Sequence, residues 1–104
     1  MSSLQHTVAF RLVHPAGSAA EVEFLETARR TLAAIPGVGA FTVSRQVSPK
    51  SDLAWHFSMV FADAAAFAAY DAHPEHQGFV RTRWVPEVAE FAELDLVAVD
   101  PSTA

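Results

Sequence analysis

The sequence predicts an α+β fold, a ferredoxin-like βαββαβ sandwich on an antiparallel four-stranded sheet. Four segments alternate between apolar and polar residues with the period of two that is typical of strands. A further segment carries apolar residues every three or four positions, the spacing of an amphipathic helix, and an alanine-rich segment after Asp63 is expected to form a second helix. Their order is strand, helix, strand, strand, helix, strand, and a chain of 104 residues has room for one such domain.

The first strand is expected over residues 4–14, because alternate positions there are apolar apart from one histidine. The alternating set consists of His6, Val8, Phe10 and Leu12. Ser18 and Glu21 lie three residues apart and form a capping box that opens the first helix, which Pro36 and Gly37 end. The expected apolar stripe of this helix consists of Val22, Leu25, Ala28, Leu32 and Ile35.

The second and third strands are expected over residues 39–48 and 53–62, with a polar turn between them. In the third strand, one face carries Trp55, Phe57, Met59 and Phe61, and the other carries His56, Ser58 and Val60. Asp63 follows and caps a second, alanine-rich helix that carries Phe67 and Tyr70. Pro74 ends this helix near His73, because proline cannot continue the hydrogen-bond ladder of a helix.

Further helical turns are expected over residues 76–84, and a fourth strand over residues 91–99. We therefore expect one domain over residues 1–100 and a short tail over residues 101–104. In this topology the first and third strands are central neighbours, and both helices cover the same face of the sheet. The other face is left bare.

The composition indicates how that bare face is covered. Apolar residues make up 51% of the chain and charged residues only 18%. A chain this short buries about two-thirds of its unfolded surface, so part of its apolar surface is expected to meet a partner. A second copy is the simplest partner, because two-fold homodimers are the commonest soluble oligomers. Two paired sheets would enclose the interior of a dimeric α/β barrel.

The charges exclude two classes of partner. The formal net charge is -5 and the 7 basic residues are scattered along the chain, which argues against nucleic acid and anionic membranes. No apolar run approaches the roughly 20 residues of a membrane span, so we expect a cytoplasmic protein. The chain has no cysteine. Any chemistry must therefore come from histidine, tyrosine, carboxylates or arginine.

Two histidines on the predicted central strands are the first candidates for a pocket. His6 lies on the first strand and His56 on the third, and if these strands are neighbours both imidazoles project from one region of the sheet. The face that each occupies depends on the register, because a slip of one residue moves a side chain to the opposite face. The alternative at each position is a half-buried histidine that is held by hydrogen bonds.

The densest polar cluster lies at the end of the second helix, over residues 70–79. His73 and His76 can exchange protons near neutral pH, since the unperturbed pKa of histidine is about 6.5. The hydroxyl of Tyr70 can donate a hydrogen bond to a developing oxyanion. The alternatives are a histidine that favours a helix C-terminus and a core aromatic residue with a solvated hydroxyl.

No metal or cofactor is expected from this cluster. His73, Glu75 and His76 are close in sequence, but Pro74 breaks the helix that would place both histidines on one side of a metal ion. The chain has no glycine-rich phosphate loop either.

Three motifs resemble the stress-responsive A/B barrel family, and the resemblance covers nearly the whole chain. The motifs are His6-Thr-Val-Ala-Phe10, Ile35-Pro-Gly-Val38 and Tyr70-x-x-His-Pro-x-His76-x-Gly-Phe79. The resemblance implies a dimeric α/β barrel, in agreement with the topology above. It implies no single reaction, because one fold hosts many functions.

The candidate residues also resemble those of a polyketide cyclase in that family. Such an enzyme closes a linear polyketide thioester by an aldol condensation without a metal or an organic cofactor. This resemblance implies that His76 and Tyr70 are catalytic, and that His6 and His56 bind the substrate. Further candidates for an apolar wall around the substrate are Phe10, Val60, Phe67, Phe79 and Trp84.

The leading hypothesis is therefore a small cofactor-independent acid/base enzyme that cyclises a polyketide or phenolic carbonyl substrate by an aldol-type reaction. His76 would act as the general base, and Tyr70 would hold the enolate or aldol oxygen. Two alternatives remain open. One is a non-catalytic stress-responsive dimer that binds a small molecule, and the other is a cofactor-free oxygenase of phenolic compounds.

Overall fold

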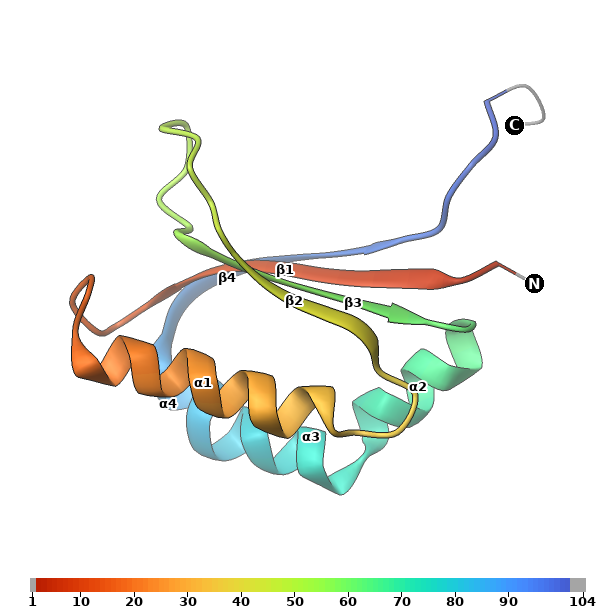
Figure 1. Ribbon diagram of the computed structural model, residues 1–104, viewed down its shortest axis with the longest axis horizontal. Helices are drawn as coiled ribbons and strands as arrows, with labels where there is room; N and C mark the ends of the chain where they lie inside the picture. The colour runs from red at the N-terminus through yellow and green to blue at the C-terminus, as the bar shows by residue number, and fades with distance from the viewer. Residues whose placement is uncertain (1, 102–104) are drawn as a thin grey trace.

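The computed structural model describes residues 2–101 and confirms the expected order of elements (Figure 1). The strands are β1 (Leu4–Leu12), β2 (Gly39–Arg45), β3 (Trp55–Phe61) and β4 (Val88–Leu96). The helices are α1 (Ala19–Ala33), α2 (Ala64–Ala72), α3 (Pro74–Phe79), the π-helical turn η1 (Val80–Trp84) and α4 (Val85–Glu87).

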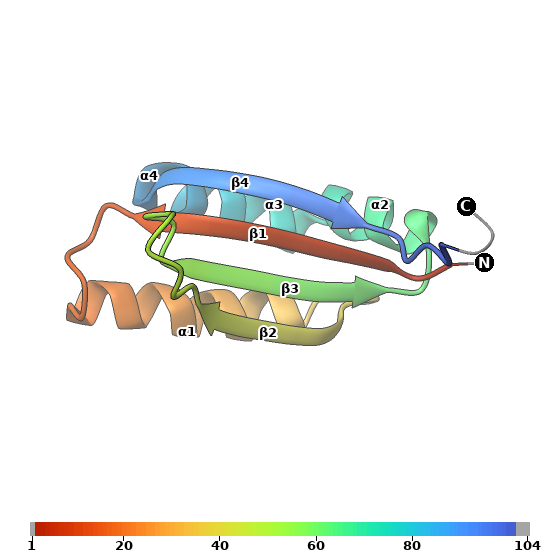
Figure 2. The ribbon, with the colours of Figure 1, turned by 90° about the horizontal axis from the view of Figure 1, so that it is seen from above.

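The sheet has the expected ferredoxin-like topology, with the order β2-β3-β1-β4 and β1 and β3 at its centre (Figure 2). Every neighbouring pair of strands is antiparallel. His6 pairs with Met59 of β3 on one side and with Asp95 of β4 on the other. This register decides which side chains of the three strands share a face.

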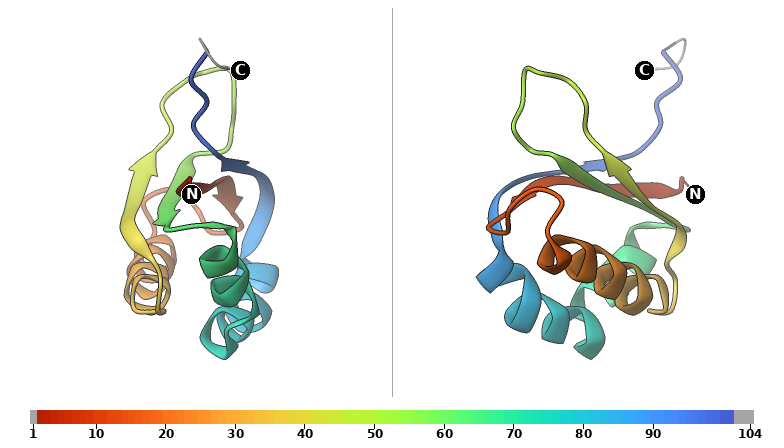
Figure 3. Two further views of the ribbon diagram at one scale, coloured as in Figure 1. Left: turned by 90° about the vertical axis from the view of Figure 1, so that its right-hand side faces the viewer. Right: turned by 60° about the vertical axis from the view of Figure 1, so that its left-hand side comes forward.

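The helices all lie on one face of the sheet and leave the other face bare, as the sequence predicts (Figures 1 and 3). Helix α1 lies under one half of the sheet, and the segment from α2 to α4 lies under the other half (Figure 3). Helices α1 and α2 are capped where the sequence predicts. The Ser18 hydroxyl accepts a hydrogen bond from the Glu21 backbone at 3.2 Å, and Asp63 accepts one from the Ala66 backbone at 2.8 Å.

The core fills the space between the sheet and the helices. On α1 the buried face differs from the expected stripe: Phe24 is fully buried, whereas Val22 is 48% exposed. The reason is that the Phe24 ring packs against Phe10 of β1, with ring centroids 6.1 Å apart. The buried apolar residues of the core are Val8, Phe10, Leu12, Phe24, Ala28, Leu32, Ile35, Phe57, Met59, Phe61, Tyr70 and Phe79.

The fourth strand lies three residues earlier than expected, over Val88–Leu96 in place of residues 91–99. Its ladder with β1 ends where Gln5 pairs with Leu96, because β1 begins at Leu4 and offers hardly any backbone beyond that point. Val97 and Val99 therefore lie past the ladder and are exposed. Most of the expected tail, residues 102–104, lies outside the described residues.

Arg83 of η1 ties the helical segment to α1. Its guanidinium donates hydrogen bonds to Glu87 and to Glu23, each at 2.5 Å, and His14 contacts Glu87 at 2.7 Å. The hydrogen bonds from Arg83 are the main reason why the pKa of Glu87 is lowered and that of Glu23 falls to about 2. We call Arg83, Glu23 and Glu87 the arginine clamp.

The arginine clamp should make stability depend on pH. Because the folded-state pKa values of both glutamates are lowered, the clamp stabilises the fold above the unfolded pKa of about 4.3 and is lost as pH falls toward about 2. Arg83→Gln should therefore lower the melting temperature by several degrees near neutral pH and by much less at about pH 2.5. Thermal unfolding followed by circular dichroism measures both. Arg81→Gln, on the exposed side of η1, is the matched control, and a pH-independent effect of Arg83→Gln would contradict the clamp.

Candidate functional site

A cavity of about 300 Å³ lies between the helix-covered face of the sheet and the segment from α2 to α4. Its wall combines a few polar groups with many apolar ones. The lining residues are His6, Val8, Leu32, Phe57, Met59, Tyr70, Asp71, His76, Phe79, Val80, Trp84, Val85, Phe91 and Glu93. The catalytic and polar substrate-binding residues expected from the sequence are His6, His56, Tyr70 and His76. The cavity brings together three of them, His6, Tyr70 and His76.

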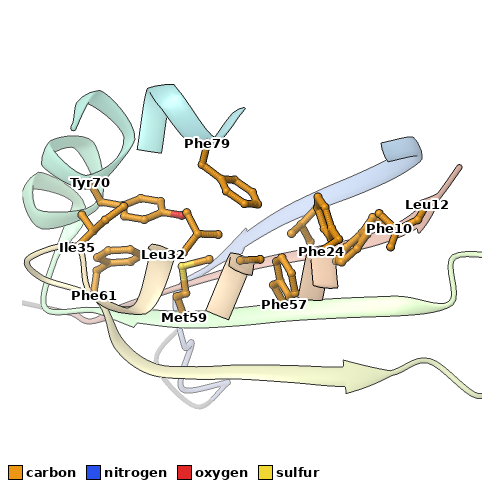
Figure 4. Packing of buried hydrophobic residues seen from close by; sticks show 12 residues of the cluster. Phe10, Leu12, Phe24, Leu32, Ile35, Phe57, Met59, Phe61, Tyr70 and Phe79 are labelled. Carbon is orange, nitrogen blue, oxygen red and sulfur yellow. The ribbon is translucent and has the colours of Figure 1, made fainter. Parts of the chain in front are cut away.

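Tyr70 stands in the last turn of α2 and is only 1% exposed. Its hydroxyl lies on the side of Leu32 and Phe79, which also line the cavity (Figure 4). Burial, aided by the charges of Asp71 and Glu93, raises the pKa of Tyr70 above its ordinary value of 10.0. The hydroxyl is thus a neutral hydrogen-bond donor at physiological pH.

His76 lies on the short helix α3, next to Tyr70, with ring centroids 4.5 Å apart. Its Nδ1 lies 2.9 Å from the backbone carbonyl of Asp71. A carbonyl can only accept a hydrogen bond, so this contact assigns the proton to Nδ1 and leaves the lone pair on Nε2. That is the tautomer that a general base needs.

His6 projects from the centre of β1 and is 8% exposed. Its Nδ1 lies 2.5 Å from Asp95 and 3.5 Å from Glu93, two carboxylates on alternate positions of β4. The ring packs against Phe67 at a centroid distance of 4.9 Å, and its centroid lies 6.2 Å from that of Tyr70. The two ring nitrogens are therefore not equivalent. The carboxylates of β4 hold Nδ1, and the ring lines the cavity.

Sequence reasoning missed Glu93 and Asp95. The only signal was their spacing of two residues, which puts both on one face of a strand, but the pairing of β4 with His6 appears only in the register. Within residues 2–101, His6, Glu93 and Asp95 are the group whose ligand atoms, all within 4.8 Å of one another, could hold a metal ion. His73, Glu75 and His76 are not part of this group, and His73 serves as the cap of helix α3, which Pro74 begins.

His56 and Val60 do not lie in the cavity, so the expectation that His56 shares a pocket with His6 is wrong. His56 pairs with Ala9, and Val60 pairs with Gln5, both of which point to the bare face of the sheet. His6 pairs with Met59, whose side chain points to the helices. Along one strand, residues an odd number of positions apart lie on opposite faces of the sheet, so His56 and Val60 face away from the side that Met59 occupies.

The expected apolar wall is correct in part. Phe79 and Trp84 line the cavity. Phe10 is fully buried in the core, where its ring lies 4.6 Å from that of Phe57, and Phe67 sits behind His6 without lining the cavity. Val80 and Trp84 reach the wall from η1, a π-helical turn, a feature that is common near functional sites.

The arrangement can move protons in a largely apolar space. It combines a neutral phenol with two imidazoles, and each imidazole has its Nδ1 held by a fixed oxygen. None of the lining residues is a lysine or an arginine, whereas Asp71 and Glu93 bring negative charge. Such a cavity favours a neutral ligand over a carboxylate or a phosphate.

Comparison with protein families finds a match over residues 4–101 to the stress responsive A/B barrel domain. The solved structure of a protein of this family with a ferredoxin-like fold, from Mesorhizobium loti, is 48% identical in sequence. The match covers 96% of this chain and 100% of that one, with a TM-score of 0.94. A comparison with curated proteins finds no match.

Two more distant structures share the fold. A dimeric ferredoxin-like protein of unknown function from Thermobifida fusca is 20% identical, with a TM-score of 0.72 and coverage of 93% of this chain and 92% of that one. A hydroxynitrile lyase from Passiflora edulis is 16% identical, with a TM-score of 0.76 and coverage of 95% of both chains. At these identities the likeness concerns the fold. No helix among residues 2–101 is long and apolar enough to cross a membrane.

The environment of Tyr70 can be tested directly, because it is the only tyrosine of the chain. Spectrophotometric titration of the native protein should place its ionisation above 10.0, whereas the denatured protein should titrate near about 10. Since the raised pKa disfavours tyrosinate in the folded state, stability should also fall as pH rises above about 10. Asp71→Asn should keep most of the elevation because burial is its largest cause. A native midpoint equal to the denatured one would contradict this account.

Proposed function

The chain belongs to the stress-responsive A/B barrel domain family, and on that premise we propose that it is a small cofactor-independent acid/base enzyme acting on a carbonyl compound. The observation that carries this proposal is the presence of Tyr70, His76 and His6 in the wall of one mostly apolar cavity. A mostly apolar cavity with a few convergent polar groups is a common form of a ligand-binding or active site, and one of these groups, Tyr70, has a raised pKa.

His76 would act as the general base. Its Nε2 carries the lone pair, because Nδ1 is engaged with the Asp71 carbonyl. It would remove a proton from the carbon next to the substrate carbonyl, and Tyr70 would donate a hydrogen bond to the enolate oxygen that forms. The raised pKa of Tyr70 suits this role, since the phenol keeps its proton at neutral pH.

The wall of the cavity indicates the class of substrate. Phe79, Trp84 and Phe91 provide aromatic surface, and the polar groups gather around Tyr70. A volume of about 300 Å³ lies at the lower end of the range for small-molecule sites. A neutral polyketide-like or phenolic carbonyl compound fits this combination, and cyclisation by an aldol step is the reaction that such a base and oxyanion donor serve.

Turnover on a simple probe tests the proposal. The probe is a linear diketone with three methylene groups between its carbonyls, which can exchange α-protons and close to a six-membered ring. In deuterated buffer the protein should accelerate deuterium uptake next to the carbonyl, followed by NMR. His76→Ala and Tyr70→Phe should each slow this exchange by about 100-fold, and Tyr70→Phe should do so with little change in binding.

His56→Gln is the matched control, because this histidine lies on the other face of the sheet. It should exchange like the wild type. If the wild type binds the probe without exchange, and His76→Ala changes only the melting temperature, the protein is the non-catalytic binding dimer. Oxygen uptake with phenolic compounds but no exchange would instead favour the cofactor-free oxygenase.

We also propose that the bare face of the sheet is covered by a second copy of the chain in a homodimer. Leu94 and Leu96 of β4 are 63% and 44% exposed there, and they pair with Thr7 and Gln5 of β1. Val60 of β3 pairs with Gln5 from the other side. The loop from β2 to β3 and the segment after β4 both project on this side of the sheet (Figure 1). A second sheet would remove this apolar surface from water.

Substitution of the bare face should break the dimer. The wild type should have twice the chain mass of 11.2 kDa by light scattering, whereas Leu94→Arg should shift to the monomer, because it would bury a charge between two sheets. Val22→Arg, on the exposed side of α1, is the control and should remain dimeric. A dimeric Leu94→Arg variant with native circular dichroism would show that this face is not the interface.

A further inference from the structure

The two cavity histidines have different partners, and this difference is the basis of a further inference. Nδ1 of His76 lies 2.9 Å from a neutral backbone carbonyl, whereas Nδ1 of His6 lies 2.5 Å from the carboxylate of Asp95, with Glu93 at 3.5 Å. An ionised carboxylate that accepts the Nδ1 proton holds the imidazole in one orientation and stabilises the imidazolium that forms when Nε2 takes up a proton. At His76 the backbone carbonyl supplies the orientation, and the carboxylate of Asp71 lies farther from Nδ1, at 3.9 Å.

The setting of His6 leaves its second nitrogen available. Among residues 2–101, no backbone or side-chain group forms a hydrogen bond with Nε2 of His6. Phe67 packs against the ring at 4.9 Å and Asp95 holds Nδ1, so the plane of the imidazole is fixed from two sides. The ring lines the same cavity as Tyr70 and His76 but comes from β1, whereas they come from α2 and α3.

We propose that His6 is the second proton-transfer group of this cavity, that it protonates the carbonyl oxygen under attack during ring closure, and that Asp95 is its positioning residue. The inference rests on the proposed function and deepens it, since it divides the proton transfers between two histidines. The carboxylate 2.5 Å from Nδ1 of His6 can balance the charge of an imidazolium that gives its proton away, whereas the nearest partner of Nδ1 of His76 is a neutral carbonyl.

The proposed step balances without an oxidant, a reductant or a metal ion. His76 removes the α-proton, and the electrons of that C–H bond form the enolate. The enolate carbon attacks the second carbonyl carbon, so a C–C bond forms and the π electrons move to the carbonyl oxygen. The His6 imidazolium gives its Nε2 proton to that oxygen, and each histidine then returns to its starting state by exchange with water.

The same diketone probe separates the two proton transfers, because α-deuteration reports the first and ring closure reports the second. Asp95→Asn and His6→Gln should slow ring closure by about 100-fold more than they slow α-deuteration. Glu90→Gln is the matched control: it lies on the same strand, but pairs with Arg11 on the bare face, and both rates should be unchanged.

A spectroscopic measurement tests the positioning role independently of turnover. In the wild type, ¹⁵N NMR of the His6 ring should show the proton on Nδ1 in the neutral form, as the contact with Asp95 requires. Asp95→Asn should shift the ring towards the Nε2-protonated form, because the amide can also donate to Nδ1. Circular dichroism shows whether the variant keeps its fold.

Three outcomes would overturn the inference. Equal losses of α-deuteration and ring closure in Asp95→Asn would show that His6 is not restricted to the second step. Identical His6 signals in wild type and Asp95→Asn would show that Asp95 does not position the ring. A shift of the His6 Nδ1 resonance on adding one equivalent of zinc, abolished by Glu93→Gln and by Asp95→Asn, would show that His6, Glu93 and Asp95 form a metal site. A wild type that catalyses neither reaction would instead contradict the proposed function itself.

Discussion

Strand β1 pairs with β3 on one side and with β4 on the other, so its register fixes the face of every side chain in the centre of the sheet. Its inward positions supply the core residues Val8, Phe10 and Leu12 and, at the same face, His6. A slip of one residue would turn this set outward. The burial of Phe10 and its neighbours therefore also holds a histidine in the wall of the cavity, so the core and the cavity wall depend on one register.

The rest of the cavity depends on how the chain returns from α2 to β4. Pro74 ends α2 and starts α3, which brings His76 over the ring of Tyr70. The π-helical turn η1 then turns Trp84 towards the cavity, and Arg83 ties the same turn to Glu23 of α1. Trp84 of the cavity wall is thus next to Arg83, and the arginine clamp holds the turn that carries both residues.

Much of the fold could be predicted from local patterns. Alternation located the four strands, and Ser18 and Asp63 located the starts of both main helices, because capping and pleating act over a few residues. The limits of β4 and the buried face of α1 were predicted less well. The first depends on where its partner strand begins, and the second on which residue meets Phe10 across the core.

For the candidate site, the types of residue and the order of the elements that carry them could be read from the amino-acid sequence: histidines at positions 6 and 76, a tyrosine at 70, and no cysteine. The folded structure was needed to show that His56 faces away from His6, and that Glu93 and Asp95 lie beside His6. These facts depend on the pairing register between strands that are distant in the chain, and no local propensity encodes that register.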